Sequence, residues 1–184
     1  MQTLTPKRNQ NPHLAKTLLL LLLLILTTTF FTSCSQEALP KPQGTAIFPE
    51  PQEHEAKEGE QFTIAIKGQN LNDLSGFQFN LAYDPQVLEA VRVEEGEFLK
   101  RAGETFKVGP DLSTAGLIAN FAVVKLGGGG KIGTGVSGSG TLATITFKAK
   151  KKGTSQLAFE NVKFVNPPSD QLSVQAFPGR VTVT

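Results

Sequence analysis

The stretch Gly76-Phe-Gln-Phe-Asn-Leu-Ala-Tyr-Asp-Pro85 decides the fold class of this 184-residue chain. Its large apolar residues occupy every second position from Phe77 to Tyr83, and Asp84-Pro85 then ends the run. Apolar residues with a period of two are typical of a strand that has one face on a core and the other toward solvent. The stretch therefore predicts a half-buried strand of an antiparallel sheet.

The same alternation recurs on both sides of this strand. Turn residues recur roughly every 8–15 residues, and no stretch has the period of an amphipathic helix. We predict an all-β chain, an antiparallel β-sandwich of roughly eight or nine strands, with a closed barrel as the second choice. The other strands are predicted at Thr45–Phe48, Phe62–Ile66, Leu88–Glu94, Leu117–Lys125, Ala143–Ala149, Thr154–Phe159 and Val181–Val183. One core is predicted from Phe62, Phe77, Phe79, Tyr83, Phe121, Ile145, Phe147 and Phe159.

The first 33 residues have the pattern of an export signal. Lys7, Arg8 and Lys16 precede the apolar run Leu18–Leu26, which is far shorter than the ~20 residues of a membrane-spanning helix. Removal of this segment takes away three basic residues and changes the formal net charge from +2 to −1. The basic character therefore belongs to the signal, and it gives no reason to expect nucleic-acid binding.

Cys34 follows this segment directly and is the only cysteine, so no internal disulfide is possible. Small residues before a cysteine at the end of an export signal resemble a bacterial lipobox, in which the thiol is lipidated. We predict lipidation at Cys34, a tether over 34–43 that reaches at most ~35 Å, and a single domain over 44–184. The alternative is an ordinary signal cleavage that leaves a soluble secreted domain.

The segment Leu126–Gly140 holds eight glycines. A phosphate-binding loop needs Lys-Ser or Lys-Thr and then a helix, whereas Lys131 precedes Ile132 and a strand follows the segment. We expect a mobile loop beside the sheet, of the kind that often borders a binding surface.

The residues of the predicted domain do not form a recognisable catalytic or metal-binding set. His54 lies in an acidic stretch and is expected in a solvated loop, and the glutamates around it lack the spacing of a Ca²⁺ loop. The chain has no Trp, and its one Tyr lies on the apolar side of its strand, so an aromatic platform for sugars is missing. Lys148 and Lys150–Lys152 are expected to be a charged strand end that discourages edge pairing. We predict no enzyme, no cofactor and no metal.

Four stretches resemble the cohesin domain in their order and spacing. They begin at Gly76, at Gly96 (Gly-Glu-Phe-Leu), at Val136 (Val-Ser-Gly-Ser-Gly-Thr-Leu-Ala-Thr-Ile-Thr-Phe-Lys-Ala) and at Gly153 (Gly-Thr-Ser-Gln-Leu-Ala-Phe-Glu-Asn-Val). The resemblance covers nearly all of residues 44–184. It implies a nine-stranded jelly-roll sandwich that is not catalytic. It also implies binding of dockerin modules, which carry Ca²⁺ and bring polysaccharide-degrading enzymes to scaffolds or cell surfaces.

In the family, the strand that matches the Gly76 stretch lies in the dockerin-facing sheet. The side chains expected to meet a partner there are Gln78, Asn80, Ala82, Asn120 and Ala122. Because the first three are expected on the solvent face, added charge there should weaken binding without lowering thermal stability. We predict an exported, lipid-anchored module of the bacterial cell envelope or surface that docks a dockerin-bearing or similar protein. A carbohydrate-binding module and an adhesive surface protein remain as alternatives.

Overall fold

The computed structural model describes residues 37–127, 134–167 and 169–184. Residues Leu39–Thr184 form one compact unit, and its described residues share a hydrophobic core. A unit with its own core can fold without the rest of the chain. The predicted signal and Cys34 lie outside the described residues. Within the part of the chain that is described, no helix is long and apolar enough to cross a membrane.

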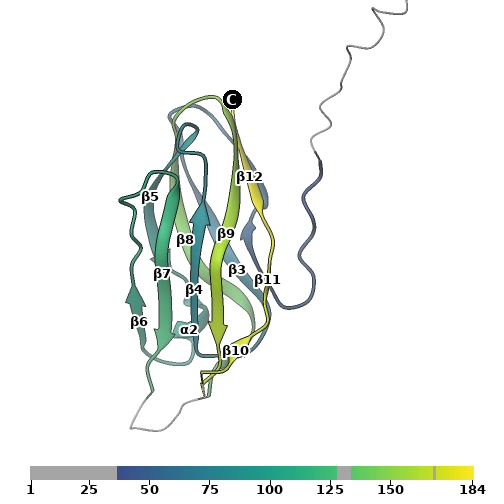
Figure 1. The fold of residues 1–184 in the computed structure, drawn as a ribbon, viewed down its shortest axis with the longest axis vertical. Coiled ribbons are helices and arrows are strands. Elements are labelled where there is room, and N and C mark those ends of the chain that lie inside the picture. The colour runs from purple at the N-terminus through teal and green to yellow at the C-terminus, as the bar shows by residue number, and fades with distance from the viewer. Residues whose placement is uncertain (1–36, 128–133, 168) are drawn as a thin grey trace, which may run out of the picture. The chain divides into compact units, whose positions relative to one another are not determined.

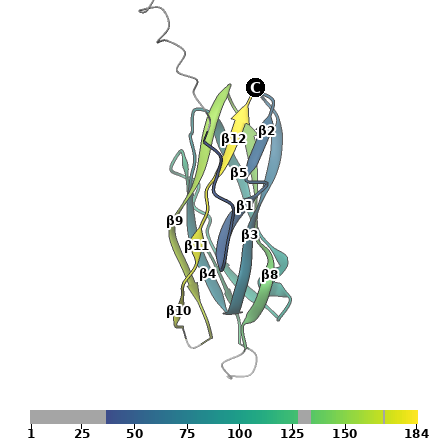
Figure 2. The ribbon, with the colours of Figure 1, turned by 90° about the vertical axis from the view of Figure 1, so that its right-hand side faces the viewer.

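The unit is a sandwich of two sheets (Figures 1 and 2). The first sheet has the strand order β11-β1-β3-β8-β5, and the second has the order β2-β12-β9-β4-β7-β6, with β10 paired to β9. Their bounds are β1 Ala46–Glu50, β2 Glu53–Ala56, β3 Gln61–Leu74, β4 Gly76–Ala82, β5 Leu88–Glu95, β6 Thr105–Val108, β7 Leu117–Lys125, β8 Val136–Ala149, β9 Gly153–Val165, β10 Gln171–Leu172, β11 Gln175–Ala176 and β12 Gly179–Val183. The predicted all-β sandwich is confirmed.

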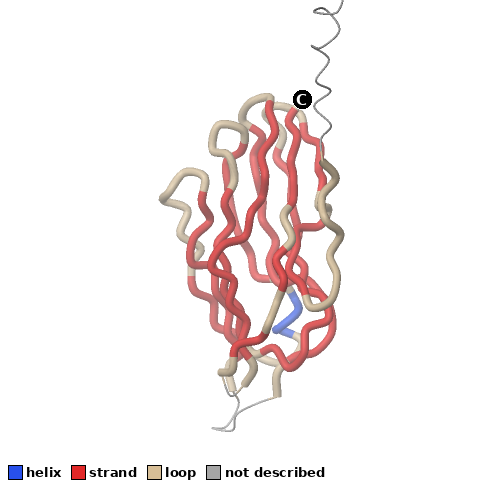
Figure 3. The backbone as a smooth tube through the Cα atoms, turned by 45° about the vertical axis from the view of Figure 1, so that its right-hand side comes forward, coloured by secondary structure: helices blue, strands red, loops and turns tan. Residues whose placement is uncertain are grey.

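The core lies between the sheets, where the alternating apolar residues of both sheets meet. Cross-strand pairs such as Phe62–Phe147 and Ile64–Ile145 bring apolar side chains together on one face of β3 and β8. Phe79 is fully buried, and its ring centroid lies 5.5 Å from that of Phe121. Six of the eight predicted core residues belong to this buried cluster, and the other two, Tyr83 and Phe159, are half-buried against it. A short helix, α2 (Glu97–Lys100), closes one end with Phe98 and Leu99 (Figure 3).

The described residues form twelve strands, more than the eight or nine predicted, because β2, β6, β10 and β11 have only two to four residues each and are too short to stand out by periodicity. Two edge pairs, β1–β11 and β2–β12, are parallel, although the prediction was purely antiparallel.

The prediction of a solvated loop at His54 is wrong. His54 lies in β2, and its ring stacks on Phe62 with centroids 4.5 Å apart. Backbone pairing with β12 holds this acidic strand at the edge of the second sheet. An ion pair adds to this pairing, with Glu53 Oε1 3.1 Å from Arg180 Nη1.

The glycine-rich segment is partly strand. Residues 128–133 lie outside the described residues, whereas β8 already begins at Val136, where a loop was predicted. Glycine is depleted in strands, so this part of β8 has little intrinsic tendency to be extended. The serine hydroxyls compensate, because Ser137 Oγ accepts a hydrogen bond from Asp73 N at 2.9 Å and Ser139 Oγ accepts one from Asn70 N at 3.0 Å.

Candidate binding surface

The outer face of the second sheet is centred on β4, which has β9 on one side and β7 on the other. Phe79 and Leu81 point into the core, so Gln78 and Ala82 point to the outer face. Both of these outer residues are half-buried. Ala122 of β7 lies directly opposite Gln78 in the strand register. The structure therefore brings Gln78 and Ala122 together, as the sequence predicted, with Ala82 farther along the same strand.

Asn80 departs from the prediction, because it is only 8% exposed and not open to solvent. Its Oδ1 accepts a hydrogen bond from Asn120 N at 2.9 Å. A bulge in β7 places both Ala119 and Asn120 opposite this one residue of β4. Asn120 is exposed and adopts a left-handed conformation with φ of 54°. The bulge explains why the alternation around Ala119 is ambiguous in the sequence.

A group of exposed apolar side chains on β6 and at the end of β7 was not predicted. Phe106 is 56% exposed and lies opposite Val124 in the register, and Val124 is itself 43% exposed. Val108 lies opposite Ala122. We call Phe106, Val108, Val124 and Leu126, all exposed, the apolar patch. Large exposed apolar side chains that gather in one place are typical of interaction sites.

Gly76 forms the floor of a shallow depression of about 220 Å³ at the edge of the apolar patch. A Cβ atom at this position would lie 2.7 Å from Val124 Cγ1 and 3.2 Å from Val165 Cγ2. The missing side chain therefore leaves a gap between two valines on the outer face. Gln78, Ala122 and Lys163 complete its outer rim.

The loop between β6 and β7 begins at the apolar patch and is hydrogen-bonded to β7. Asp111 and Ala119 exchange two backbone hydrogen bonds, each 2.9 Å long. The backbone N–H of Ser113 donates to Asp111 Oδ1 at 2.9 Å. This bond, together with a bond from the Ser113 side chain, lowers the pKa of the exposed Asp111 carboxyl below its ordinary 3.8.

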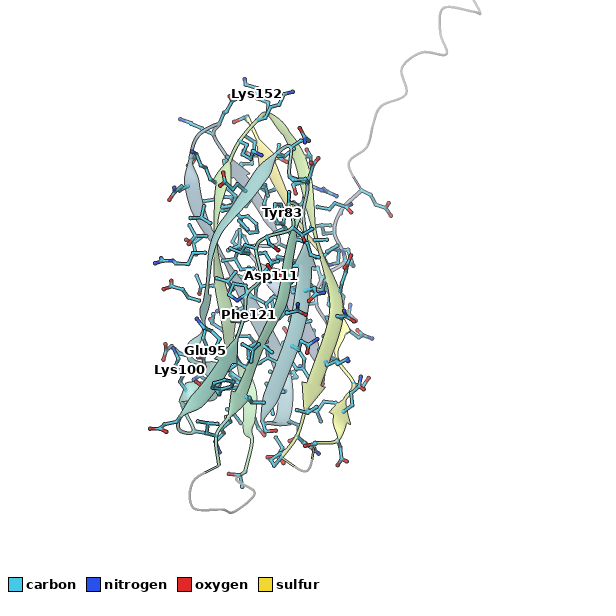
Figure 4. All side chains as sticks on the ribbon, turned by 60° about the vertical axis from the view of Figure 1, so that its left-hand side comes forward. Tyr83, Glu95, Lys100, Asp111, Phe121 and Lys152 are labelled. Atoms are coloured by element: carbon cyan, nitrogen blue, oxygen red, sulfur yellow. The ribbon has the colours of Figure 1, made fainter. Side chains whose placement is uncertain are left out.

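The lysines predicted to form a charged strand end lie at the other end of the sandwich from α2. Figure 4 shows Lys152 at the end opposite Lys100 and Glu95. Lys150 Nζ donates to the carbonyl of Pro85 at 2.7 Å, which ties this turn to the turn after β4. In the described ranges, no three His, Cys, Asp or Glu side chains are grouped so that they could hold a metal ion.

The alternation of Phe106 and Val108 with Lys107 could have indicated the missed part of the surface. An apolar residue at every second position predicts a strand, but it does not tell whether the apolar side faces a core or solvent. Phe106 and Val108 face outward because they pair with Val124 and Ala122, which lie on the outer face of β7, and this register is not visible in the sequence.

A β-sandwich that exposes large apolar side chains on one sheet face is typical of a binding module. The family model described as the cohesin domain matches residues 50–183, and this chain belongs to the cohesin family. Cohesins are non-catalytic modules, so the chain is not an enzyme.

A sequence relative is Cell surface glycoprotein 1 of Acetivibrio thermocellus, which is 31% identical over 121 residues. The match covers 57% of this chain, and the chain spans only 5% of that protein.

Solved cohesin structures share the fold. The OlpC cohesin in a type I cohesin–dockerin complex from Clostridium thermocellum has a TM-score of 0.61 and 18% identity, over 80% of this chain and 98% of that one. A type II cohesin of the ScaA adaptor scaffoldin from Acetivibrio cellulolyticus has a TM-score of 0.62 and 21% identity, over 76% and 91%. A non-cellulosomal cohesin from Archaeoglobus fulgidus has a TM-score of 0.60 and 17% identity, over 77% and 92%.

Proposed function

We propose that this chain is an exported, membrane-anchored module that docks a dockerin-bearing protein on the outer face of β9, β4, β7 and β6. The observation that carries the proposal is the apolar patch beside the Gly76 depression. Solved relatives in complex with dockerins support the class of partner. The partner is proposed to bring a polysaccharide-degrading enzyme to the cell envelope.

The surface suits a protein partner because its apolar and polar parts are arranged as in other protein interfaces. Central apolar contacts give most of the binding free energy, and a polar rim contributes little. An apolar side chain of the dockerin fits over Gly76 between Val124 and Val165, while Gln78 and Lys163 lie at the border and contact its polar groups.

The path of the tether supports docking at a membrane without obstruction of this surface. Gln52 Nε2 donates to the carbonyls of both Pro40 and Pro178, each at 3.1 Å. This clamp holds the tether near β2 and β12, whereas β6 lies at the opposite edge of the same sheet. Only five residues lie between Cys34 and Pro40, so the chain allows a lipid on Cys34 to be at most ~20 Å from the clamp.

Titration of purified dockerins tests the docking. Dockerin modules encoded in the source genome are expressed singly, and each is titrated into residues 39–184 by calorimetry, with Ca²⁺ and then with EDTA. We expect at least one dockerin to bind with Ca²⁺ and to lose binding in EDTA, because the metal orders the dockerin. A panel in which none binds, with a soluble polysaccharide or an unrelated surface protein binding instead, would contradict the proposal.

Metabolic labelling tests the anchor. The full chain and its Cys34→Ser variant are expressed in a bacterial host with radiolabelled palmitate. We expect label and membrane association for the full chain, and neither for Cys34→Ser. A full chain that is exported without label would establish the ordinary signal cleavage instead.

A further inference from the structure

Asn80 is nearly buried although its side chain lies on the outer face of the sheet. A buried carboxamide costs free energy unless its groups are hydrogen-bonded. Its Oδ1 accepts the backbone N–H of Asn120 at 2.9 Å. The side chain is therefore engaged inside the sheet and is poorly placed to contact a partner directly.

The Asn120 N–H needs this acceptor because the β-ladder is interrupted there. The register between β4 and β7 passes from Phe79–Phe121 to Leu81–Ile118, which leaves Asn80 opposite two residues. In such a bulge the extra residue is left without a ladder partner. Asn80 Oδ1 supplies the acceptor that the β4 backbone does not, and an unpaired N–H in its place would be costly.

The same bulge supports the loop that leads back to the apolar patch. Ala119, the other bulge residue, exchanges two backbone hydrogen bonds with Asp111. Gly109, with φ of 71°, packs so closely on the Asn120 carbonyl that no Cβ atom would fit. Gly109 directly follows Val108, the last residue of β6. Gly109 and Asp111 thus tie the end of β6 to the bulge, in addition to the ladder that pairs β6 with β7.

We propose that Asn80 is a positioning residue for docking: through the Asn120 bulge it fixes where β6 places Phe106 and Val108 beside Val124. This inference rests on the proposed function, since it concerns the same surface. Asn80 acts without touching the dockerin, whereas the Gly76 depression and the apolar patch make the contact.

The test compares Asn80→Leu, which keeps the side-chain size and removes the acceptor, with Ser155→Ala. Ser155 is also buried, and its Oγ accepts the backbone N–H of Asp84 at 2.9 Å. Through this bond Ser155 holds the turn that follows β4. Both variants thus leave one backbone N–H unpaired. Asn80 lies in the middle of the proposed surface, whereas Ser155 lies in β9 beyond Ala158, where the pairing with β4 ends.

Three quantities are measured on residues 39–184: amide exchange at Asn120, the melting temperature, and the affinity for the tightest dockerin of the panel. We expect Asn80→Leu to speed Asn120 exchange and to weaken binding by about tenfold or more. Ser155→Ala should lower the melting temperature comparably and bind like the parent. A variant that restores the acceptor, Asn80→Asp with Glu160→Gln to remove the acidic cross-strand neighbour, should recover both Asn120 protection and affinity.

Parent-like affinity in Asn80→Leu would overturn the inference, and so would an equal loss of affinity in Ser155→Ala, because the effect would then be one of stability alone. If Asn80→Leu does not fold, Asn80→Ser replaces it, since the shorter hydroxyl does not reach Asn120 N. If the parent domain binds no dockerin of the panel, that result contradicts the proposed function and therefore also this inference.

Discussion

Phe79 shows how a single residue of the central strand determines the stability of the sandwich. It is fully buried, and its ring contacts those of Phe77, Phe121 and Phe159. We expect Phe79→Ala to cost roughly 3–5 kcal/mol of unfolding free energy, because it removes a large apolar side chain and leaves a cavity. Urea denaturation measures the change. Phe106→Ala on the exposed patch should cost far less, and a Phe79→Ala variant as stable as the parent would contradict the strand register.

Gly76 allows a test of binding in which a side chain is added, because one methyl group at this position fills the depression. We expect Gly76→Ala to weaken dockerin binding by about tenfold or more, since the partner's apolar side chain loses its place between Val124 and Val165. The melting temperature should fall only slightly, because the added methyl group meets Val124 on the solvent side of the sheet, where this 43% exposed side chain has room to shift. Calorimetric titration beside a melting curve separates the two effects, and unchanged affinity would show that the depression is not used.

Ala82 and Asn80 differ in a way that the sequence does not reveal. Both lie on the outer face, but only Ala82 is partly open. We expect Ala82→Glu to reduce binding and leave the melting temperature nearly unchanged, as the sequence predicts. Asn80→Arg should lower both, because a buried position receives a charge and Asn120 N loses its acceptor. Circular dichroism melts of the two variants distinguish these outcomes, and equal melting temperatures would contradict the burial of Asn80.

At the scale of the element, sequence periodicity predicts strands that have one face on the core. Leu117–Lys125 has the same bounds in the structure as in the prediction, because its alternation spans the whole strand. β2 has no such signal, since only His54 and Ala56 face inward and the strand depends on pairing with β12. The candidate surface was likewise predictable only in part. The outward positions of Gln78 and Ala122 can be predicted from alternation. The burial of Asn80 depends on a bulge, and the apolar patch depends on which strands are neighbours, and neither can be read from the sequence.

The start of β8 provides a test of an element with weak intrinsic propensity. Ser137 and Ser139 accept backbone N–H groups of β3, which holds a glycine-rich strand in the sheet. We expect the double variant Ser137→Ala with Ser139→Ala to lose about 1–2 kcal/mol of unfolding free energy, the sum of two ordinary hydrogen bonds. Amide exchange at Asn70 and Asp73 should rise with it. Unchanged exchange at these two residues would mean that the hydroxyls do not hold the strand.

At the scale of the whole molecule, the proposed docking surface lies on the second sheet only, and the first sheet has no part in it. Val124 on β7 and Val91 on β5 are each 43% exposed, but they belong to different sheets. The same substitution at both positions therefore adds the same charge at the same exposure, once inside the proposed docking surface and once outside it. Both variants should melt like the parent, since surface changes of this kind rarely alter stability by more than about 0.5 kcal/mol.

The most direct measurement is the affinity of Val124→Asp and of Val91→Asp for the dockerin that binds residues 39–184 most tightly. We predict that Val124→Asp loses about a hundredfold or more in affinity, because an unpaired charge is desolvated in an apolar contact, and that Val91→Asp binds like the parent. Parent-like binding by Val124→Asp, or a loss of binding in Val91→Asp alone, would show that the partner uses a different surface.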